Sequence, residues 1–323
     1  MKNSIPAFNS NGFIHTAELR IKWRDGIDIQ TNLNDKTNPK RINKWQAGVN
    51  ETGKSSSMVF NPNHECFFIK QSARWSEPET CYSLFKFNQI LNLWASEKGY
   101  CQSDIHVSRI DFAVDHKDPQ NAAFFKKLSD LLITSFVVKH KVTAKAQYYT
   151  TDIIHRTPKS ICATAKPFEV TCYNKHIQSS QTDAIWRFEM RYFKDLRHKK
   201  YTETAVKDML LLLSEELNSL KEYYYATIET LSAELSKEYQ ALQEKSKDKI
   251  NVNQFIAQNA DRFFSRKQLE LFFTHLGREE KSAKNAANNY SDRVSHLYVN
   301  KTSYARFIDM LQMQIQTYIQ NDA

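Results

Sequence analysis

Apolar and polar residues alternate along several short segments of the first 200 residues, a pattern typical of strands with one buried face. The predicted strands cover residues 13–24, 58–70, 105–115, 134–138, 168–175 and 184–193. Two other segments, 79–98 and 119–132, have helical spacing of their apolar residues. Strands mixed with helices in this order predict an α+β fold, in which a sheet carries helices on one face.

Beyond residue 200 the apolar residues recur in steps of three or four, which predicts helices. These steps run from Leu210 to Leu242 without a Gly or Pro, so a long amphipathic helix is expected over 203–246. Further helices are predicted at about 265–277, 279–298 and 302–319. We therefore expect two domains, a basic α+β domain over 1–200 and an all-helical domain over 201–323.

The charge is distributed as unevenly as the hydrophobic pattern. The 323 residues include 45 Lys and Arg against 36 Asp and Glu, a net charge of +9. Residues 1–200 carry 30 basic and 19 acidic side chains, whereas residues 201–323 carry 15 and 17. A basic domain rich in Tyr and Phe favours a nucleic acid as partner, because each neutralised phosphate releases counterions. No basic amphipathic helix suited to a membrane surface stands out.

Several other classes of protein are excluded by the sequence. Five cysteines without a CxxC pair argue against a disulfide framework or a structural zinc site, and favour a reducing cytoplasm. The chain has no apolar run long enough to span a membrane. Its first residues also lack the shorter apolar run that a signal peptide contains. The segment 48–55 matches the phosphate-loop pattern GxxxxGK[ST], but its flanks predict neither a buried strand before it nor a helix after it.

Three predicted strands combine one apolar face with one face rich in ionisable groups. The segments are HVSRIDFAVDH (106–116), FEVTCYNKH (168–176) and AIWRFEMRYF (184–193). Their ionisable faces consist of Arg109, Asp111, Ala113 and Asp115, of Glu169, Thr171, Tyr173 and Lys175, and of Arg187, Glu189 and Arg191. If the three strands share a sheet, these faces form one surface of acids, bases and a tyrosine.

Phosphodiester cleavage is the chemistry that this surface fits. Tyr173 can attack phosphorus and form a covalent intermediate, with Lys175 close by on the same strand. A divalent cation, Mg²⁺ or Mn²⁺, would polarise the phosphate oxygens. Asp111 and Asp115 lie about 13 Å apart along a regular strand and cannot share one ion. We therefore pair Asp111 with Glu189 across strands and keep Asp115 as a weaker candidate.

Further basic and aromatic residues are candidates for binding DNA phosphates and bases. The set consists of Arg109, Arg187, Arg191, Lys141, Lys145, Tyr148 and Tyr149. Tyr148 and Tyr149 could stack on bases, as a single-strand binder requires, or either could replace Tyr173 as the nucleophile. His176 is a candidate general base or metal ligand, or an exposed turn residue. His64, His106 and His116 have no partner at ligand spacing.

The ordered segments VSRIDFAVDH, VTCYNKH and WRFEMRYFK resemble the motif set of rolling-circle replication initiators, the filamentous-phage replication endonucleases and plasmid replication initiation factors. The resemblance covers about residues 100–200. It implies site-specific nicking of one origin strand, with the tyrosine linked to the 5′ phosphate. It assigns the nucleophile to Tyr173, the lysine two positions on to Lys175, and the acids of the flanking strands to Asp111 and Glu189. A two-histidine metal site is not expected, because no His-hydrophobic-His motif is present.

The sequence thus predicts a tyrosine-dependent, metal-assisted DNA nickase and ligase that initiates rolling-circle replication in a bacterial cytoplasm. Its partners would be origin DNA and a host helicase or polymerase, and no membrane. A conjugative relaxase and a non-enzymatic origin-binding initiator are the alternatives.

Two questions about the helical part stay open at this stage. The long helix could form a homodimer or pack on its own domain. The helices after residue 265 could read duplex DNA as a helix-turn-helix, but the net charge of −2 over 201–323 makes packing or oligomerisation at least as good an explanation.

Overall fold

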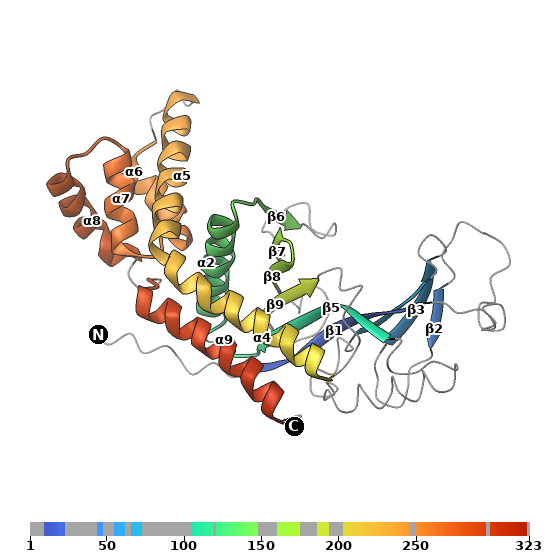
Figure 1. The fold of residues 1–323 in the computed structure, drawn as a ribbon. Helices are drawn as coiled ribbons and strands as arrows, with labels where there is room; N and C mark the ends of the chain where they lie inside the picture. The colour runs from blue at the N-terminus through green and yellow to red at the C-terminus, as the bar shows by residue number, and fades with distance from the viewer. Residues whose placement is uncertain are drawn as a thin grey trace.

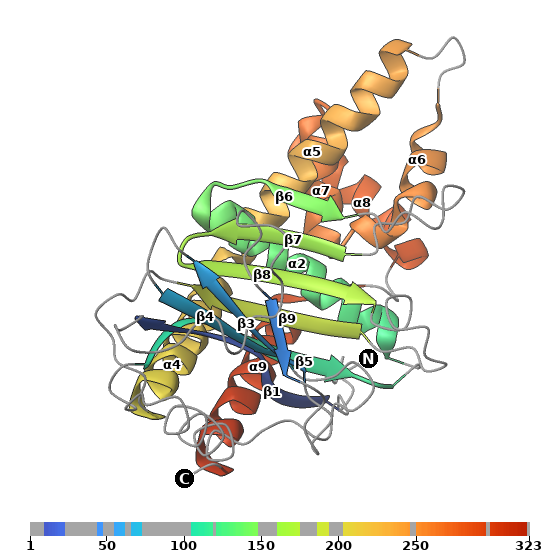
Figure 2. The same ribbon diagram turned by 90° about the vertical axis from the view of Figure 1, so that its right-hand side faces the viewer.

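The chain folds as a β-sheet followed by helices, and the α+β class with a helical C-terminal region is confirmed (Figures 1 and 2). The computed structural model describes residues 10–22, 44–47, 55–61, 66–72, 105–118, 121–147, 160–174, 186–193, 203–245, 250–294 and 298–321. Within these ranges every helix is too short or too polar to cross a bilayer. The predicted helix at 79–98 lies outside the described residues.

The described strands form one antiparallel sheet in the order β2-β3-β4-β1-β5-β9-β8-β7-β6. Their bounds are β1 (Ser10–Lys22), β2 (Lys44–Ala47), β3 (Ser55–Asn61), β4 (Cys66–Ser72), β5 (Ile105–His116), β6 (Ala144–Gln147), β7 (Ser160–Ala165), β8 (Phe168–Asn174) and β9 (Trp186–Phe193). The three strands with ionisable faces, β5, β9 and β8, are adjacent in the middle of this order.

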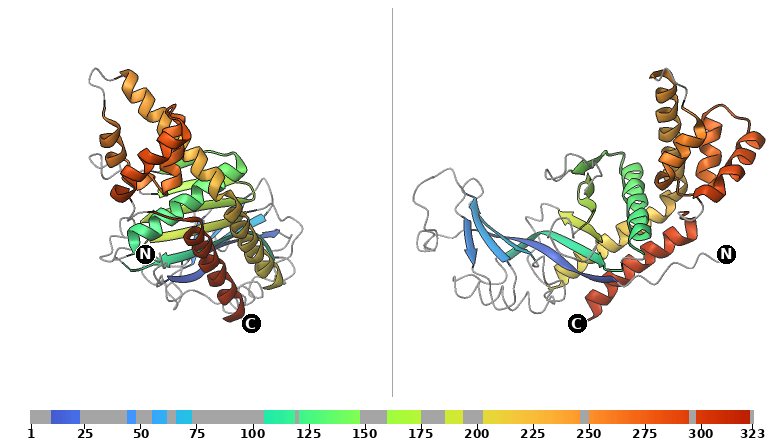
Figure 3. Two further views of the ribbon diagram at one scale, coloured as in Figure 1. Left: turned by 90° about the vertical axis from the view of Figure 1, so that its left-hand side faces the viewer. Right: turned by 180° about the vertical axis from the view of Figure 1, so that it is seen from behind.

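One described helix, α2, lies between β5 and β6 in the chain, and the other described helices follow β9. Their bounds are α2 (Ala122–His140), α4 (Glu203–Leu220), the 3₁₀ turn η4 (Lys221–Tyr223), α5 (Tyr224–Lys245), α6 (Val252–Gln258), the 3₁₀ turn η5 (Ala260–Arg262), α7 (Arg266–His275), α8 (Glu280–Val294) and α9 (Lys301–Asn321). Helices α2, α4 and α9 cover one face of the sheet (Figure 3).

A first hydrophobic core lies between the sheet and these covering helices. Phe112 of β5 and Phe188 of β9 point into it from the sheet, while Leu132, Leu213 and Phe307 enter from α2, α4 and α9. The apolar faces of β5, β8 and β9 therefore pack against helices from both sides of residue 200. The proposed domain division at that residue stays a prediction.

Helix α9 comes very close to β1 at Gly12. A Cβ at this position would lie 2.6 Å from Cζ of Phe112 and 2.8 Å from Cβ of Gln314. The amide of Gly12 donates a hydrogen bond to Oε1 of Gln314 at 2.9 Å. This crossing therefore depends on the absence of a side chain.

A second hydrophobic core is formed by the end of α5 with α6, α7 and α8. Leu235, Phe255, Phe263, Phe272 and Ala287 are among its buried members. The two cores meet near α2 and the start of α7, where the ammonium of Lys127 donates to the backbone carbonyl of Phe263 at 2.9 Å.

Most predicted strands match the structure, but two expectations are wrong. Residues 58–70 belong to two strands, β3 and β4, rather than one. Residues 134–138 lie inside α2, where Phe136 is fully buried in the first core. Strands β2, β6 and β7 were not predicted, and β2 directly precedes the phosphate-loop match. Residues 55–61 after the phosphate-loop match form a strand rather than a helix, which agrees with the rejection of that motif.

The predicted helices after residue 200 agree with the structure more closely than the predicted strands do. The long helix expected over 203–246 is present as α4 and α5, joined through the 3₁₀ turn η4 without a loop. The three later helices correspond to α7, α8 and α9, and α6 was not predicted.

Candidate active site

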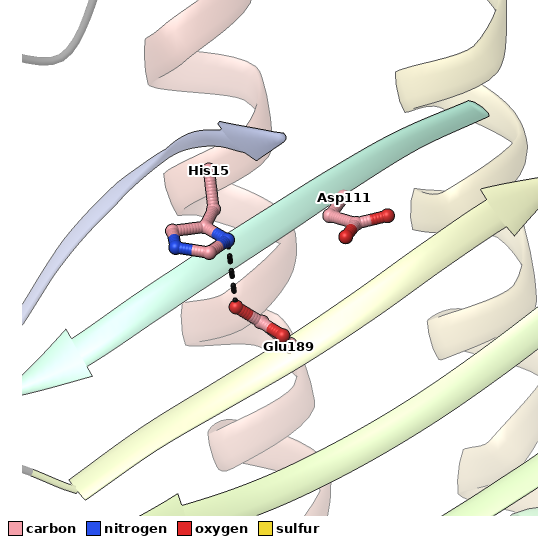
Figure 4. A group of neighbouring side chains, drawn as sticks. All are labelled: His15, Asp111 and Glu189. Carbon is pink, nitrogen blue, oxygen red and sulfur yellow. Dashed lines mark ion pairs between the residues drawn. The ribbon is translucent and has the colours of Figure 1, made fainter. Parts of the chain in front are cut away.

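Strand register places the three ionisable faces on one side of the sheet. Antiparallel partners share a face, and the pairs are Asp111↔Arg191, Ala113↔Glu189, Asp115↔Arg187, Glu169↔Arg191, Thr171↔Glu189 and Tyr173↔Arg187. The neighbouring residues Ile110, Phe112 and Val114 point to the opposite side, into the first core. The ionisable surface thus lies on the sheet face away from α4 and α9 (Figure 4).

A β-bulge in β1 adds a histidine to this surface. Ile14 pairs with Phe112 and Thr16 pairs with Asp111, so His15 is an extra residue in β1. Bulges re-aim side chains and are frequent next to active sites. Here Nδ1 of His15 lies 3.0 Å from Oε1 of Glu189. The sequence analysis missed His15, because it sought the site only on three strands with a face rich in ionisable groups.

His15, Asp111 and Glu189 form a group that could hold a metal ion (Figure 4). One ligand atom from each residue lies within 4.8 Å of the other two. One imidazole and two carboxylates are a donor set that suits a divalent cation such as Mn²⁺ or Mg²⁺. The two acids predicted from sequence are thus brought together, and a histidine from a third strand joins them.

Two arginines bind the carboxylate of Asp111. Nε of Arg109 donates to its Oδ1 at 2.6 Å, and Nε of Arg191 donates to the same oxygen at 2.9 Å. Arg191 also contacts Glu169. The side chains of Arg109 and Arg191 are 18% and 25% exposed, so both still reach the surface beside the metal-binding group.

Arg187 is placed differently from the phosphate-binding role predicted for it. Its side chain is 1% exposed, and its Nε and Nη2 donate to the buried carboxylate of Asp115 at 2.5 and 2.7 Å. Its guanidinium also lies 5.0 Å from the ring centre of Phe13. This arrangement favours an internal positioning role for Arg187. It also engages Asp115, which therefore faces a guanidinium and not the metal-binding group.

Tyr173 lies directly beside the metal-binding group. Its hydroxyl donates a hydrogen bond to Oε1 of Glu189 at 3.0 Å, and the residue is 6% exposed. Burial raises the pKa of Tyr173 well above its ordinary value, and the charge of Glu189 adds to this effect, while the guanidinium of Arg187 opposes it. The phenol is therefore neutral in this structure.

The remaining predicted site residues divide into two groups. Lys145 is exposed on β6 and belongs to the same register row as Thr171 and Glu189, so it shares the sheet face of the site. Lys141 is exposed at the C-terminal end of α2. The other candidates lie outside the described residues, and they are Tyr148, Tyr149, Lys175 and His176.

Comparison with known proteins gives little further guidance. No protein-family model and no curated protein matches the sequence. Among solved structures, the chain is similar to a rolling circle replication initiator protein from Geobacillus stearothermophilus, with a TM-score of 0.30 and 13% identity. The match covers 58% of this chain and 76% of that one. At this level of similarity the match does not define the function of the chain.

Proposed function

We propose that the chain is a site-specific DNA nicking and joining endonuclease that initiates rolling-circle replication, with Tyr173 as its nucleophile. The observation that carries this proposal is the 3.0 Å hydrogen bond from the Tyr173 hydroxyl to Glu189, a member of the His15–Asp111–Glu189 group. A tyrosine beside donors for a divalent cation is an arrangement suited to phosphodiester transesterification. The ordered sequence motifs around Asp111, Tyr173 and Glu189 support the same reaction.

In the proposed step the oxygen of Tyr173 attacks the phosphorus of the scissile linkage, and the bond from phosphorus to the 3′ oxygen breaks. The phenolic proton passes to Glu189, which already accepts a hydrogen bond from the hydroxyl. The departing 3′ oxygen takes a proton from solvent and becomes a free 3′-OH that can prime synthesis. The 5′ phosphate stays esterified to Tyr173, and attack by a 3′-OH on this ester rejoins the strand.

The residues that would hold Mg²⁺ or Mn²⁺ are His15, Asp111 and Glu189. The cation would polarise the phosphate oxygens and offset the charge that develops on them. The carboxylate of Glu189 is less tightly paired with arginine, because its ion pair with Nη1 of Arg187 is 3.8 Å long. The carboxylate of Asp111, in contrast, is already bound closely by two arginines.

We propose that DNA runs over the sheet face that carries the site. Arg109 and Arg191 are partly exposed beside Asp111, and Lys145 extends the basic surface towards the β6 edge. Arginines beside a reaction centre can bind phosphates in bidentate geometry. We also propose contacts from Lys141, Lys175, Tyr148 and Tyr149, with origin DNA as the substrate and a host helicase or polymerase as a later partner.

A nicking assay with a matched tyrosine control tests the proposal. The full chain is incubated with Mn²⁺ and supercoiled DNA of the replicon that carries its gene, and nicked circles and protein–DNA adducts are quantified. We expect Tyr173→Phe to give neither product. Tyr192→Phe makes the same chemical change on the opposite face of the sheet and should nick like the parent. Equal nicking by the parent and Tyr173→Phe would reject this nucleophile.

Sequence-specific binding without any cleavage by the parent would favour a non-enzymatic initiator, and cutting only at a transfer origin would favour a relaxase.

Metal binding is tested separately by titrating Mn²⁺ into the protein in a calorimeter. We expect His15→Asn to weaken Mn²⁺ binding by at least about tenfold, as loss of residues that build a metal site generally does. The control is His275→Asn on α7, because that histidine is exposed and pairs with Glu229 far from the sheet. An unchanged affinity in His15→Asn would remove His15 from the site.

A further inference from the structure

Helices α7 and α8 are joined by a tight turn of the type found in helix-turn-helix motifs. The four residues 276–279 connect them, and Gly277 within this turn has a φ of +84°. The amides of Leu276, Gly277 and Arg278 donate to the last carbonyls of α7 at 2.9–3.1 Å. DNA-binding helix-turn-helix motifs have such a turn of three or four residues, often with a glycine.

Small residues on the inner face of α8 hold it against aromatic residues of α7. Ala283, Ala286 and Ala287 are buried in the second core beside Phe272 and Phe273. Close packing of this kind fixes the orientation of a helix, since alanines have no rotamers to adjust.

Helix α7 is in turn fixed to α5 and at its own first turn. The hydroxyls of Ser232 and Ser236 on α5 donate to the carbonyls of Gln268 and Phe272. Oγ of Ser265 accepts the amide of Gln268 at 3.1 Å and caps the start of the helix. Because α8 packs on α7, its orientation is fixed relative to α5 as well.

The outer face of α8 is polar, and after Glu280 in its first turn the exposed residues are lysines, asparagines and a serine. Its exposed described residues are Glu280, Lys281, Ser282, Lys284, Asn285, Asn288 and Asn289. No acidic residue occurs between positions 281 and 291. Lys281 and Lys284 form no ion pair with any residue that the structure describes. In contrast, Lys267 on α7 is paired with Glu270.

This face also stands clear of the rest of the molecule. Helix α8 lies at the outer side of the helical region, on the side away from the sheet (Figures 1 and 3). Its 15 residues extend about 22 Å at 1.5 Å per residue, which suits the major groove. Lysines match the charge of phosphates, and asparagine amides can form bidentate hydrogen bonds with adenine in the major groove.

We infer that α8 is a recognition helix that enters the major groove of duplex DNA, at a site separate from Tyr173. The net charge of −2 over 201–323 did not point to this surface, because it averages Lys281 and Lys284 with the acidic residues of the whole region. The inference deepens the proposed function and rests on it in one respect, namely that the duplex recognised would be the origin.

Salt dependence of binding tests the two lysines. The probe is a fluorescein-labelled 30-bp duplex of mixed sequence, and its binding to the full chain is followed by anisotropy in EDTA over a series of NaCl concentrations. Each phosphate that is no longer neutralised lowers the slope of log K against log[salt] by about 0.9, so Lys281→Gln/Lys284→Gln should lower it by about 1.8. The matched control is Lys237→Gln/Lys245→Gln, because these lysines are exposed on α5 and outside the motif. It should keep the parent's slope. Equal slopes for the two double variants would overturn the inference.

Sequence recognition is tested by selecting sites from a randomised duplex library with the parent protein. Replacing Asn285, Asn288 and Asn289 by alanine should reduce the preference for the selected site over a mismatched one, by about 5- to 150-fold for each base that the variant no longer reads. An unchanged preference would show that α8 does not read bases. Loss of dimer mass in light scattering by either α8 variant, with duplex binding unchanged, would identify the face as a protein interface instead.

Failure of this inference can be told apart from failure of the proposed function. If α8 is the recognition helix, Tyr173→Phe binds the duplex like the parent, and the α8 variants keep the parent's Mn²⁺ affinity. Absence of nicking by the parent, with loss of duplex binding only in the α8 variants, would leave the inference standing without the nuclease. Nicking by the parent, with normal duplex binding by the α8 variants, would support the nuclease and reject α8 as the recognition helix.

Discussion

Glu189 is the residue on which the contacts of the candidate site converge. Its Oε1 accepts a hydrogen bond from Tyr173 and lies 3.0 Å from Nδ1 of His15. Asp111 is held by Arg109 and Arg191 on the same face. The proposed nucleophile and the histidine of the metal-binding group therefore both contact the carboxylate that is the proposed proton acceptor.

The buried pair of Asp115 and Arg187 makes a prediction at the same scale. Asp115→Asn removes the two charge-assisted hydrogen bonds of the buried Arg187 guanidinium and leaves it, among the residues that the structure describes, only the more distant carboxylate of Glu189, 3.8 Å away. Loss of one partner of a buried ion pair should lower the free energy of unfolding by about 3–5 kcal/mol. The control is Glu238→Gln, because Glu238 forms a similar two-bonded pair with Arg262 at the surface. The control should cost at most about 1 kcal/mol. Urea denaturation measures both, and equal losses would contradict the structural role assigned to Arg187.

Part of this site follows from sequence alone, for a physical reason. Side chains alternate in strands and antiparallel partners share a face, so the alternation placed Asp111, Glu189 and Tyr173 on one surface without knowledge of the register. His15 could not be predicted in this way. The place of β1 beside the site is defined only by pairing with β5, which lies about 90 residues further along the chain.

At the scale of elements, tertiary packing determines the secondary structure of residues 134–138 against their local sequence preference. The run TSFVV at 134–138 predicts a strand by its β-branched and aromatic residues, but it completes α2. Ser135 and Thr134 accommodate the helix by donating to the carbonyls of Leu131 and Asp130. Burial of Phe136 in the first core then outweighs the local preference.

The crossing of β1 and α9 gives a prediction for Gly12. Gly12→Ala places a Cβ against Phe112 and Gln314 and should lower the free energy of unfolding by about 1–3 kcal/mol, the usual cost of overpacking. Urea denaturation provides the value. Combining it with Phe112→Leu, which shortens the ring that clashes, should cost less than the sum of the two single changes. Strict additivity would show that the two groups do not compete for space.

For the whole molecule, Lys127 links the two hydrophobic cores. Its ammonium donates to the carbonyl of Phe263 and lies 5.0 Å from the ring centre of Phe264. Burial lowers the pKa of Lys127 from 10.5 to about 8, while the charges of Asp261 and Asp130 oppose the shift. The positive charge is therefore carried at a cost in the folded protein below pH 8.

The stability of the whole chain should depend on pH through this residue. Between about pH 8 and 10 the unfolded chain binds a proton on Lys127 that the folded chain has lost, so the free energy of unfolding rises with pH. From pH 7.5 to 9.5 the parent should gain about 1–2 kcal/mol relative to Lys127→Met, which lacks the group. Urea denaturation at both pH values measures this difference. A constant gap between the two proteins would show that Lys127 titrates normally.

The central claim is that the Tyr173 oxygen becomes bonded to the 5′ phosphate of the cut strand. The most direct test is to trap the adduct formed with DNA and Mn²⁺, digest it with nuclease and protease, and map the modified peptide by mass spectrometry. The account predicts a nucleotide on Tyr173. In a control without DNA, the same peptide should be unmodified. A nucleotide found on Tyr148 or Tyr149, with Tyr173 intact, would contradict it.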